Sequence, residues 1–106
     1  MKFGLSSKTI EKLQRVLAHH ASVKQAWLFG SRAWGNFQAG SDIDLALEGQ
    51  AITHAEQLQI MNEIDDLLLP YQVDLLLMKK ISNPELSKRI KQDGKMIYQR
   101  AERVPA

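Results

Sequence analysis

Two aspartates stand at the start of a short apolar strand, and they constrain the fold of this chain more than any other feature. Residues 42–47 read Asp-Ile-Asp-Leu-Ala-Leu, and from the second residue onward the alternation is typical of a strand that buries one face. Side chains two positions apart on a strand point the same way, so Asp42 and Asp44 are expected on one side of the sheet. Residues 33–78 contain no lysine or arginine that could neutralise them.

A third aspartate lies inside the next predicted strand, residues 71–79. If this strand pairs with residues 43–47 so that Asp44 stands opposite Asp74, their Cβ atoms come within about 4.5–5.5 Å. Like charges that close raise each other's pKa and cost stability unless a cation joins them. Carboxylate oxygens favour magnesium or manganese over zinc. A lone aspartate is more often solvated on a sheet face, but Asp42, Asp44 and Asp74 together predict a divalent-metal site.

A Gly-Ser turn precedes the aspartates and follows an apolar run at residues 24–29, which is predicted to be a buried strand. Glycine lets the backbone approach a ligand closely, and the first N–H groups of a following helix are unpaired. Gly30 and Ser31 can therefore cradle a phosphate, with Arg32 adding charge, although ordinary turn chemistry explains most such pairs. A phosphate here and a metal at the aspartates would together describe one nucleoside triphosphate.

The remaining elements indicate a single compact α+β unit spanning residues 1–106. The 106 residues suit one domain. Apolar spacing and capping residues predict the other elements, which are helices at 7–20, 53–69 and 82–93 and a short edge strand at 95–99. Capping boxes are expected at Thr53 and Ser82, each followed three residues later by glutamate. Within the second helix, an apolar stripe is expected to face the core; it comprises Leu58, Met61, Ile64 and Leu68.

Composition narrows the class of protein and its partners. The chain has no cysteine, which excludes disulfides and thiolate metal sites, and no apolar run approaching the roughly 20 residues of a membrane span, so a cytoplasmic location is expected. Residues 1–32 hold six basic and one acidic residue, residues 33–78 hold eight acidic residues, and residues 79–106 hold eight basic and three acidic residues. Chance clustering on solvated faces is one interpretation. The other is an acidic, cation-binding centre flanked by basic surface that attracts an anion.

The spacing of Gly30-Ser31, ten further residues and then Asp42-Ile43-Asp44 resembles the signature of the nucleotidyltransferase superfamily that includes DNA polymerase beta. The length, the wider stretch from the Gly-Ser turn to the aspartates and the later Val-Asp-Leu-Leu-Leu resemble the minimal nucleotidyltransferases (MNT proteins) in particular. These are antitoxin partners of HEPN-domain toxins. The resemblance extends over residues 5–100, nearly the whole chain.

The resemblance implies a small mixed β-sheet with helices packed on one face, two Mg²⁺ ions and ATP as the donor. Members of this family transfer AMP to a tyrosine of the partner HEPN toxin and silence its RNase activity, and they usually assemble with that partner as multimers. By analogy, Gly30 and Ser31 would hold the terminal phosphates, and Asp42 and Asp44 would ligate the metals. Asp74 would ligate one metal and help to deprotonate the attacking hydroxyl.

The loop between the turn and the aspartates departs from the family pattern. It carries Trp34, Asn36, Phe37 and Gln38, whereas many relatives carry basic residues there, and fewer charges predict weaker triphosphate binding. Trp34 and Phe37 suit either base stacking or loop packing. Two other functions stay open: an inactive binding module that occludes the toxin, and a small-molecule nucleotidyltransferase of the aminoglycoside-modifying kind. The lack of a second domain for an acceptor pocket argues against the latter.

Overall fold

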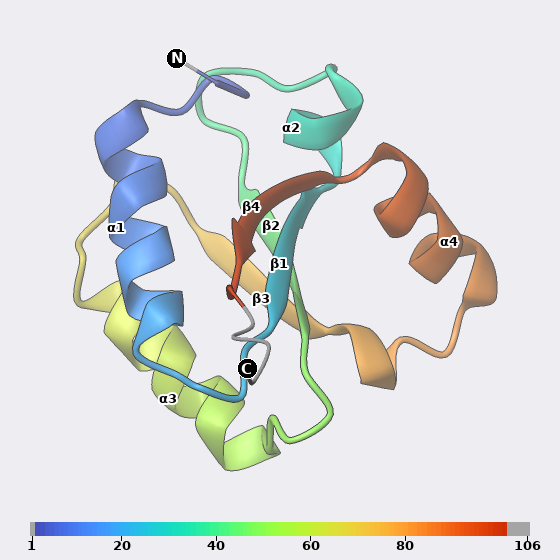
Figure 1. Cartoon of the computed structure of the whole chain (residues 1–106). Coiled ribbons are helices and arrows are strands. Elements are labelled where there is room, and N and C mark those ends of the chain that lie inside the picture. The colour runs from blue at the N-terminus through green and yellow to red at the C-terminus, as the bar shows by residue number, and fades with distance from the viewer. Residues whose placement is uncertain (1, 102–106) are drawn as a thin grey trace.

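The computed structural model describes residues 2–101 as a four-stranded sheet with helices on both faces (Figure 1). The elements are α1 (Ser7–Ala18), β1 (Gln25–Phe29), α2 (Ser31–Trp34), β2 (Ile43–Glu48), α3 (His54–Asp65), β3 (Val73–Leu77), the 3-10 turn η1 (Met78–Lys80), α4 (Pro84–Asp93) and β4 (Lys95–Gln99). The predicted α+β class and the order of elements are confirmed. Within the described residues, no helix combines the length and apolarity needed to cross a bilayer.

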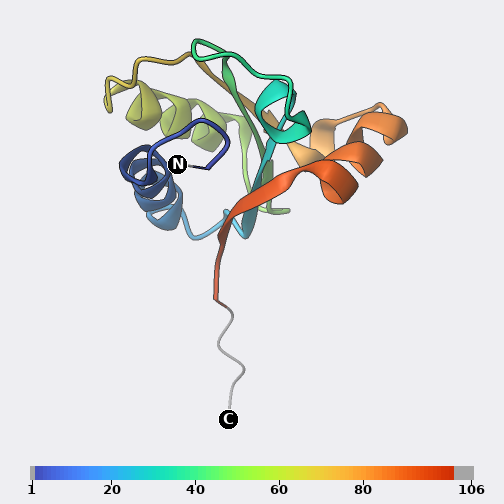
Figure 2. The same cartoon turned by 90° about the horizontal axis from the view of Figure 1, so that it is seen from above.

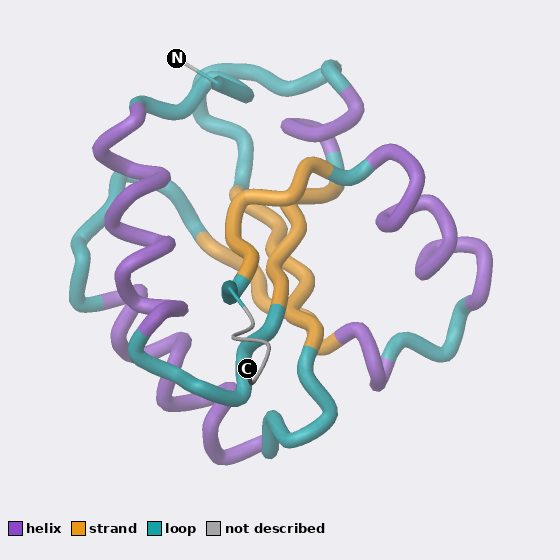
Figure 3. Tube along the Cα trace, in the orientation of Figure 1, coloured by secondary structure: helices purple, strands orange, loops and turns teal. Residues whose placement is uncertain are grey.

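The sheet is mixed, with strand order β3-β2-β1-β4. β1 runs antiparallel to both of its neighbours, β2 and β4, whereas β2 and β3 are parallel. The predicted edge strand at residues 95–99 is therefore present, and it pairs with β1. In Figure 3 the strands form one continuous orange layer, and the long teal loop between α2 and β2 crosses one end of it. This end, where β1 stops and β2 and β3 begin, carries the residues of interest.

The strands bury both faces of the sheet, because their alternate side chains enter two separate apolar clusters. One face of β2 packs with α1 and α3 and includes Ile43, Leu45 and Leu47. On the other face, Trp27 and Ala46 pack with Ile90 of α4. Figure 2 shows α4 on the opposite side of the sheet from α1 and α3. Placement of the helices on one face, which the family resemblance implied, thus describes α1 and α3 but not α4.

Of the two N-terminal caps expected from the sequence, the one at Thr53 is confirmed, because its hydroxyl accepts from the N–H of Glu56. In α1 the Ser6 hydroxyl likewise accepts from the N–H of Thr9, and Gly94 ends α4. The other expectation, a cap at Ser82, is wrong. Asn83 caps α4 instead, because Pro84 occupies the first helical position and the side chain before it is the one that reaches the free N–H groups.

The apolar stripe expected on α3 is also corrected. Ile60 and Ile64 are the buried residues of this helix, whereas Leu58 is 49% exposed and Leu68 is 87% exposed. Positions two apart on a helix point to nearly opposite sides, so burial of Ile60 turns Leu58 outward. Leu68 lies beyond the end of the helix at Asp65 and has a positive φ of 54°.

Candidate nucleotide and metal site

Asp44 and Asp74 lie side by side on neighbouring strands. Each is the second residue of its strand, and the parallel register of β2 and β3 pairs them directly, which confirms the expected opposition. Adjacent strands are about 4.8 Å apart. Both side chains are partly buried and point to the face that α4 covers further along the sheet, opposite the face that buries Ile43. Two carboxylates therefore share one patch at the end of the sheet.

Asp42 is an exposed residue that lies just before β2 and is not part of the strand. It is near enough to affect Asp44, whose pKa is raised by burial first and then by the negative charges of Asp74 and Asp42. Within residues 2–101, none of the three carboxylates forms an ion pair with a basic side chain. The patch thus carries negative charge that the described part of the protein leaves uncompensated.

These carboxylates suit a Mg²⁺ ion that is held jointly by the protein and a phosphate group. They do not suit an ion that is enclosed by protein ligands alone. In the part of the chain that the structure describes, no group of three acidic or histidine side chains converges tightly enough to surround an ion alone. Mg²⁺ is commonly held by one or two carboxylates together with substrate phosphates and water. Asp44 and Asp74, with Asp42 beside them, match that arrangement in chemistry and in charge.

The Gly-Ser turn directly adjoins the carboxylates. Phe29, the last residue of β1, pairs with Asp44, so the chain enters the turn beside that side chain. Gly30 has φ 74° and ψ −156°, and a Cβ atom added to it would overlap the carboxylate of Asp44. The position therefore requires glycine both for its backbone conformation and for its space. Ser31 then begins α2, a single turn that ends at Gly35.

Arg32 does not extend the phosphate site, and our expectation for it is corrected. Its side chain is 1% exposed, and its guanidinium donates to the carbonyl oxygens of Phe3, Ala39 and Ser41 at 2.8–3.3 Å. The rings of Phe37 and Tyr71 flank it, with centroids 5.4 and 4.8 Å away. The guanidinium holds the loop in place: four of its five N–H groups donate to these carbonyls, and its burial closes it off from a ligand. The same contacts assign Phe37 to loop packing.

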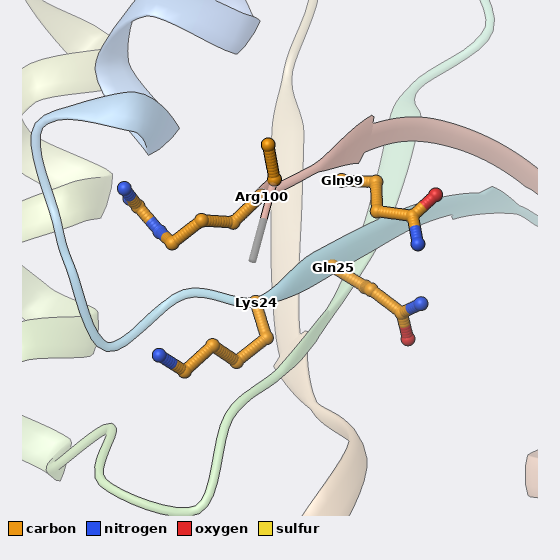
Figure 4. Close-up of a pocket in the computed structure, with 5 residues that line it drawn as sticks. Lys24, Gln25, Gln99 and Arg100 are labelled. Carbon is orange, nitrogen blue, oxygen red and sulfur yellow. The ribbon is translucent and has the colours of Figure 1, made fainter. Parts of the chain in front are cut away.

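Another hollow lies at the other end of the sheet. It measures about 550 Å³ and is lined by Lys24, Gln25, Gln99, Arg100 and Ala101. The four labelled side chains in Figure 4 are long and polar, and they spread apart. Lys24 precedes β1, whereas Gly30 and Asp44 lie at the point where β1 ends. Arg100 is committed to the carbonyl oxygens of Ala18, His20 and Val23. This hollow is separate from the carboxylates, which we take as the functional site.

Comparison with known proteins agrees with this geometry. The family model described as "Polymerase beta, Nucleotidyltransferase" matches residues 11–103. Two proteins of Methanocaldococcus jannaschii, both named as protein adenylyltransferases, are 32% identical over 101 residues and 30% identical over 99 residues. Each alignment covers 86% of this chain and 98% of the relative.

Solved structures share the fold at lower identity. A toxin–antitoxin structure with AMP-PNP superposes with a TM-score of 0.68 at 23% identity, covering 91% of this chain and 75% of that one. A complex of the tri-AMPylated Shewanella oneidensis HEPN toxin with its MNT antitoxin gives a TM-score of 0.68 at 17% identity, covering 91% and 74%. The match of the family model over most of the chain, together with two relatives at 30% identity or more, shows that this chain belongs to the polymerase beta nucleotidyltransferase family.

Proposed function

We propose that this nucleotidyltransferase is an antitoxin-type protein adenylyltransferase that transfers AMP from ATP to a tyrosine hydroxyl of a HEPN-domain RNase toxin and so neutralises it. The observation that carries the proposal is the pairing of Asp44 with Asp74 beside the Gly30 turn. The names of the two archaeal relatives support protein adenylylation. The complexes of structurally similar chains, which contain a HEPN toxin or AMP-PNP, support the partner and the nucleotide.

Each residue of the site has a role in this proposal. Gly30 and Ser31 would hold the terminal phosphates of ATP, and Asp42, Asp44 and Asp74 would hold the two Mg²⁺ ions. Magnesium, when bound, neutralises charge on the phosphate oxygens. Such an ion would stabilise the charged forms of Asp44 and Asp74, because its positive charge offsets the repulsion between the two carboxylates.

The transfer itself is an in-line substitution at phosphorus. The tyrosine oxygen forms a bond to the α-phosphorus while the bond from that phosphorus to the oxygen bridging to the β-phosphate breaks. Pyrophosphate leaves with that oxygen, and the proton of the tyrosine hydroxyl passes to Asp74. The position of Asp74 on an edge strand suits this role, because within residues 2–101 no further strand pairs with the outer side of β3 and an acceptor chain can approach it there.

The test is transfer of label from ATP to the product of the neighbouring gene in the presence of magnesium. Label on that protein, lost in an Asp42→Asn/Asp44→Asn variant, is the expected result. The matched control is Asp65→Asn/Asp66→Asn, which removes two carboxylates from exposed positions at the end of α3. It should transfer label like the unchanged protein.

The same assay decides between this proposal and the other two functions. Toxin neutralisation without label, equal in the Asp42/Asp44 double variant, would establish a binding module that acts by occlusion. Label on an added aminoglycoside and none on the partner would establish a small-molecule transferase. Either result would overturn protein adenylylation.

A further inference from the structure

The proposed site is short of positive charge, and this inference rests on the proposed function. The triphosphate of ATP carries several negative charges, yet the residues around Gly30 that face it are carboxylates. The loop from residue 33 to residue 41 has no basic residue. Arg32 is buried, and four of its five N–H groups donate to backbone carbonyls. A cation from another part of the fold is therefore needed near the turn.

The C-terminal part of the fold brings two cations to that turn. At the end of β1, Phe29 pairs with Asp44 on one side, while on the other side Leu28 pairs with Lys95 at the start of β4. The Gly30-Ser31 turn therefore lies between two neighbouring strands. β2 carries Asp44 near its start, and β4 begins with Lys95. A chain of phosphates that starts at the aspartates and crosses the turn would run toward β4.

Arg89 and Lys95 line one hollow together with Trp34 of the single-turn helix α2. The centre of its guanidinium lies 4.2 Å from the centroid of the Trp34 ring. Residues three apart on a helix are neighbours, so Trp34 adjoins Ser31 on the surface of α2. Stacking on tryptophan fixes the orientation of a guanidinium and leaves its N–H groups free to meet an anion in the ring's neighbourhood. Arg89 also lies 3.8 Å from Asp93, but that exposed contact is long and therefore weak.

A small hollow joins these groups. It measures about 250 Å³ and lies between α2 and the junction of α4 with β4. Two cations and one carboxylate belong to its walls, which are formed by Ala33, Trp34, Arg89, Gln92, Asp93 and Lys95. The side chain of Arg89 is 55% exposed, so its charge is accessible to a ligand. The hollow is polar and open, as suits the charged tail of a nucleotide better than a base.

We propose that Arg89, oriented by Trp34 and assisted by Lys95, binds the β- and γ-phosphates of ATP. Arg89 thereby supplies the positive charge that the loop of residues 33–41 lacks. Arg89 is then the residue that contacts the departing pyrophosphate, and Trp34 is a positioning residue. Arg89 should therefore contribute to the affinity for ATP but not to that for AMP, because AMP has neither the β- nor the γ-phosphate.

Binding of nucleotides to the isolated protein tests this inference without any acceptor. The probes are AMP and an ATP analogue with a methylene bridge between the α- and β-phosphorus atoms, each titrated calorimetrically with magnesium present. Arg89→Ala should weaken binding of the ATP analogue about tenfold or more, the scale of one charge-assisted hydrogen bond to phosphate, and leave AMP unchanged. Arg89→Lys should recover part of the loss, since it keeps the charge but not the planar donors.

The matched control is Lys91→Ala, which removes the same charge from α4 two positions further on and hence from another side of the helix. It should leave both affinities unchanged. Equal affinities for the ATP analogue in Arg89→Ala and Lys91→Ala, or an equal loss for AMP, would overturn the inference, as would absence of any ATP binding. Binding that follows the expected pattern without transfer to a partner would contradict the proposed function and leave the role of Arg89 standing.

Discussion

Replacing Gly30 by alanine tests whether the turn and the carboxylates act as one site. The φ of 74° and ψ of −156° at Gly30 lie in a region almost restricted to glycine, and holding alanine there costs about 1–3 kcal/mol. The added Cβ would also overlap Oδ2 of Asp44 and lie 3.2 Å from its Cγ. The carboxylate or the turn must therefore move, and either movement separates the two halves of the site.

Two other glycines provide controls for each part of this effect. Gly35 also has a positive φ, 94°, but an added Cβ would meet nothing within 4 Å. Gly40 has neither a positive φ nor a neighbour within that distance. Urea denaturation should show a loss of about 1–2 kcal/mol for Gly35→Ala, at least as large a loss for Gly30→Ala, and little change for Gly40→Ala.

Thermal unfolding with and without Mg-ATP then isolates the contribution of the site. At this chain length a change of 1 kcal/mol shifts the Tm by about 4–8 °C, so both effects are measurable. We expect Mg-ATP to raise the Tm of the wild type, Gly35→Ala and Gly40→Ala by similar amounts and to leave Gly30→Ala unshifted. Equal shifts in Gly30→Ala and Gly35→Ala would refute the reasoning, because backbone strain alone would then account for both variants.

Three further substitutions test the electrostatics of the fold. Asp44→Asn should raise the free energy of unfolding at pH 7 without metal, because burial and neighbouring charges raise the pKa of Asp44, and it should abolish stabilisation by added Mg²⁺. Arg32→Lys should cost about 3 kcal/mol in urea denaturation, since buried carbonyls lose their donors. Hydrogen bonds from Ser22 and His20 lower the pKa of Glu56 below 4.5, so that Glu56 stabilises the fold above that pH. Glu56→Gln should therefore unfold with a lower free energy than the wild type at pH 7. This difference in stability should disappear as the solution is acidified below pH 4.5.

The pairing of the aspartates could be predicted because it depends on local rules that act together. Strand alternation places Asp44 on the face opposite Ile43, and burial of Ile43 fixes which face that is. The echo of the same pattern around Asp74 in the next strand then suggests the register, which the structure confirms. The position of the Gly-Ser turn could be predicted in a similar way. The turn directly follows a buried strand, so it lies next to the neighbouring strand that carries Asp44.

The features that sequence reasoning missed depend on tertiary contacts between distant segments. Nothing local distinguishes an arginine that meets a phosphate from Arg32, whose partners include a carbonyl at residue 3. Likewise, Arg89 and Trp34 are 55 positions apart, and only the return of β4 to the far side of β1 brings them together. The exposed side of α3 was misassigned because Leu58 and Ile60 are equally apolar, and packing against the sheet decided between them.

The buried arginine and the uncompensated carboxylates are two parts of one arrangement. Arg32 follows the Gly-Ser turn, and its guanidinium donates to the carbonyl of Ser41, the residue before Asp42. It thus anchors both ends of the loop that carries the first aspartate back to the sheet. Four of its five N–H groups donate to carbonyls and aromatic rings flank it, so within the described residues it forms no ion pair with the carboxylates. A flexible, exposed arginine in the same place would pair with Asp42 or Asp44 and compete with a metal ion. Burial of Arg32 therefore positions the acidic site and also leaves it open to an external cation.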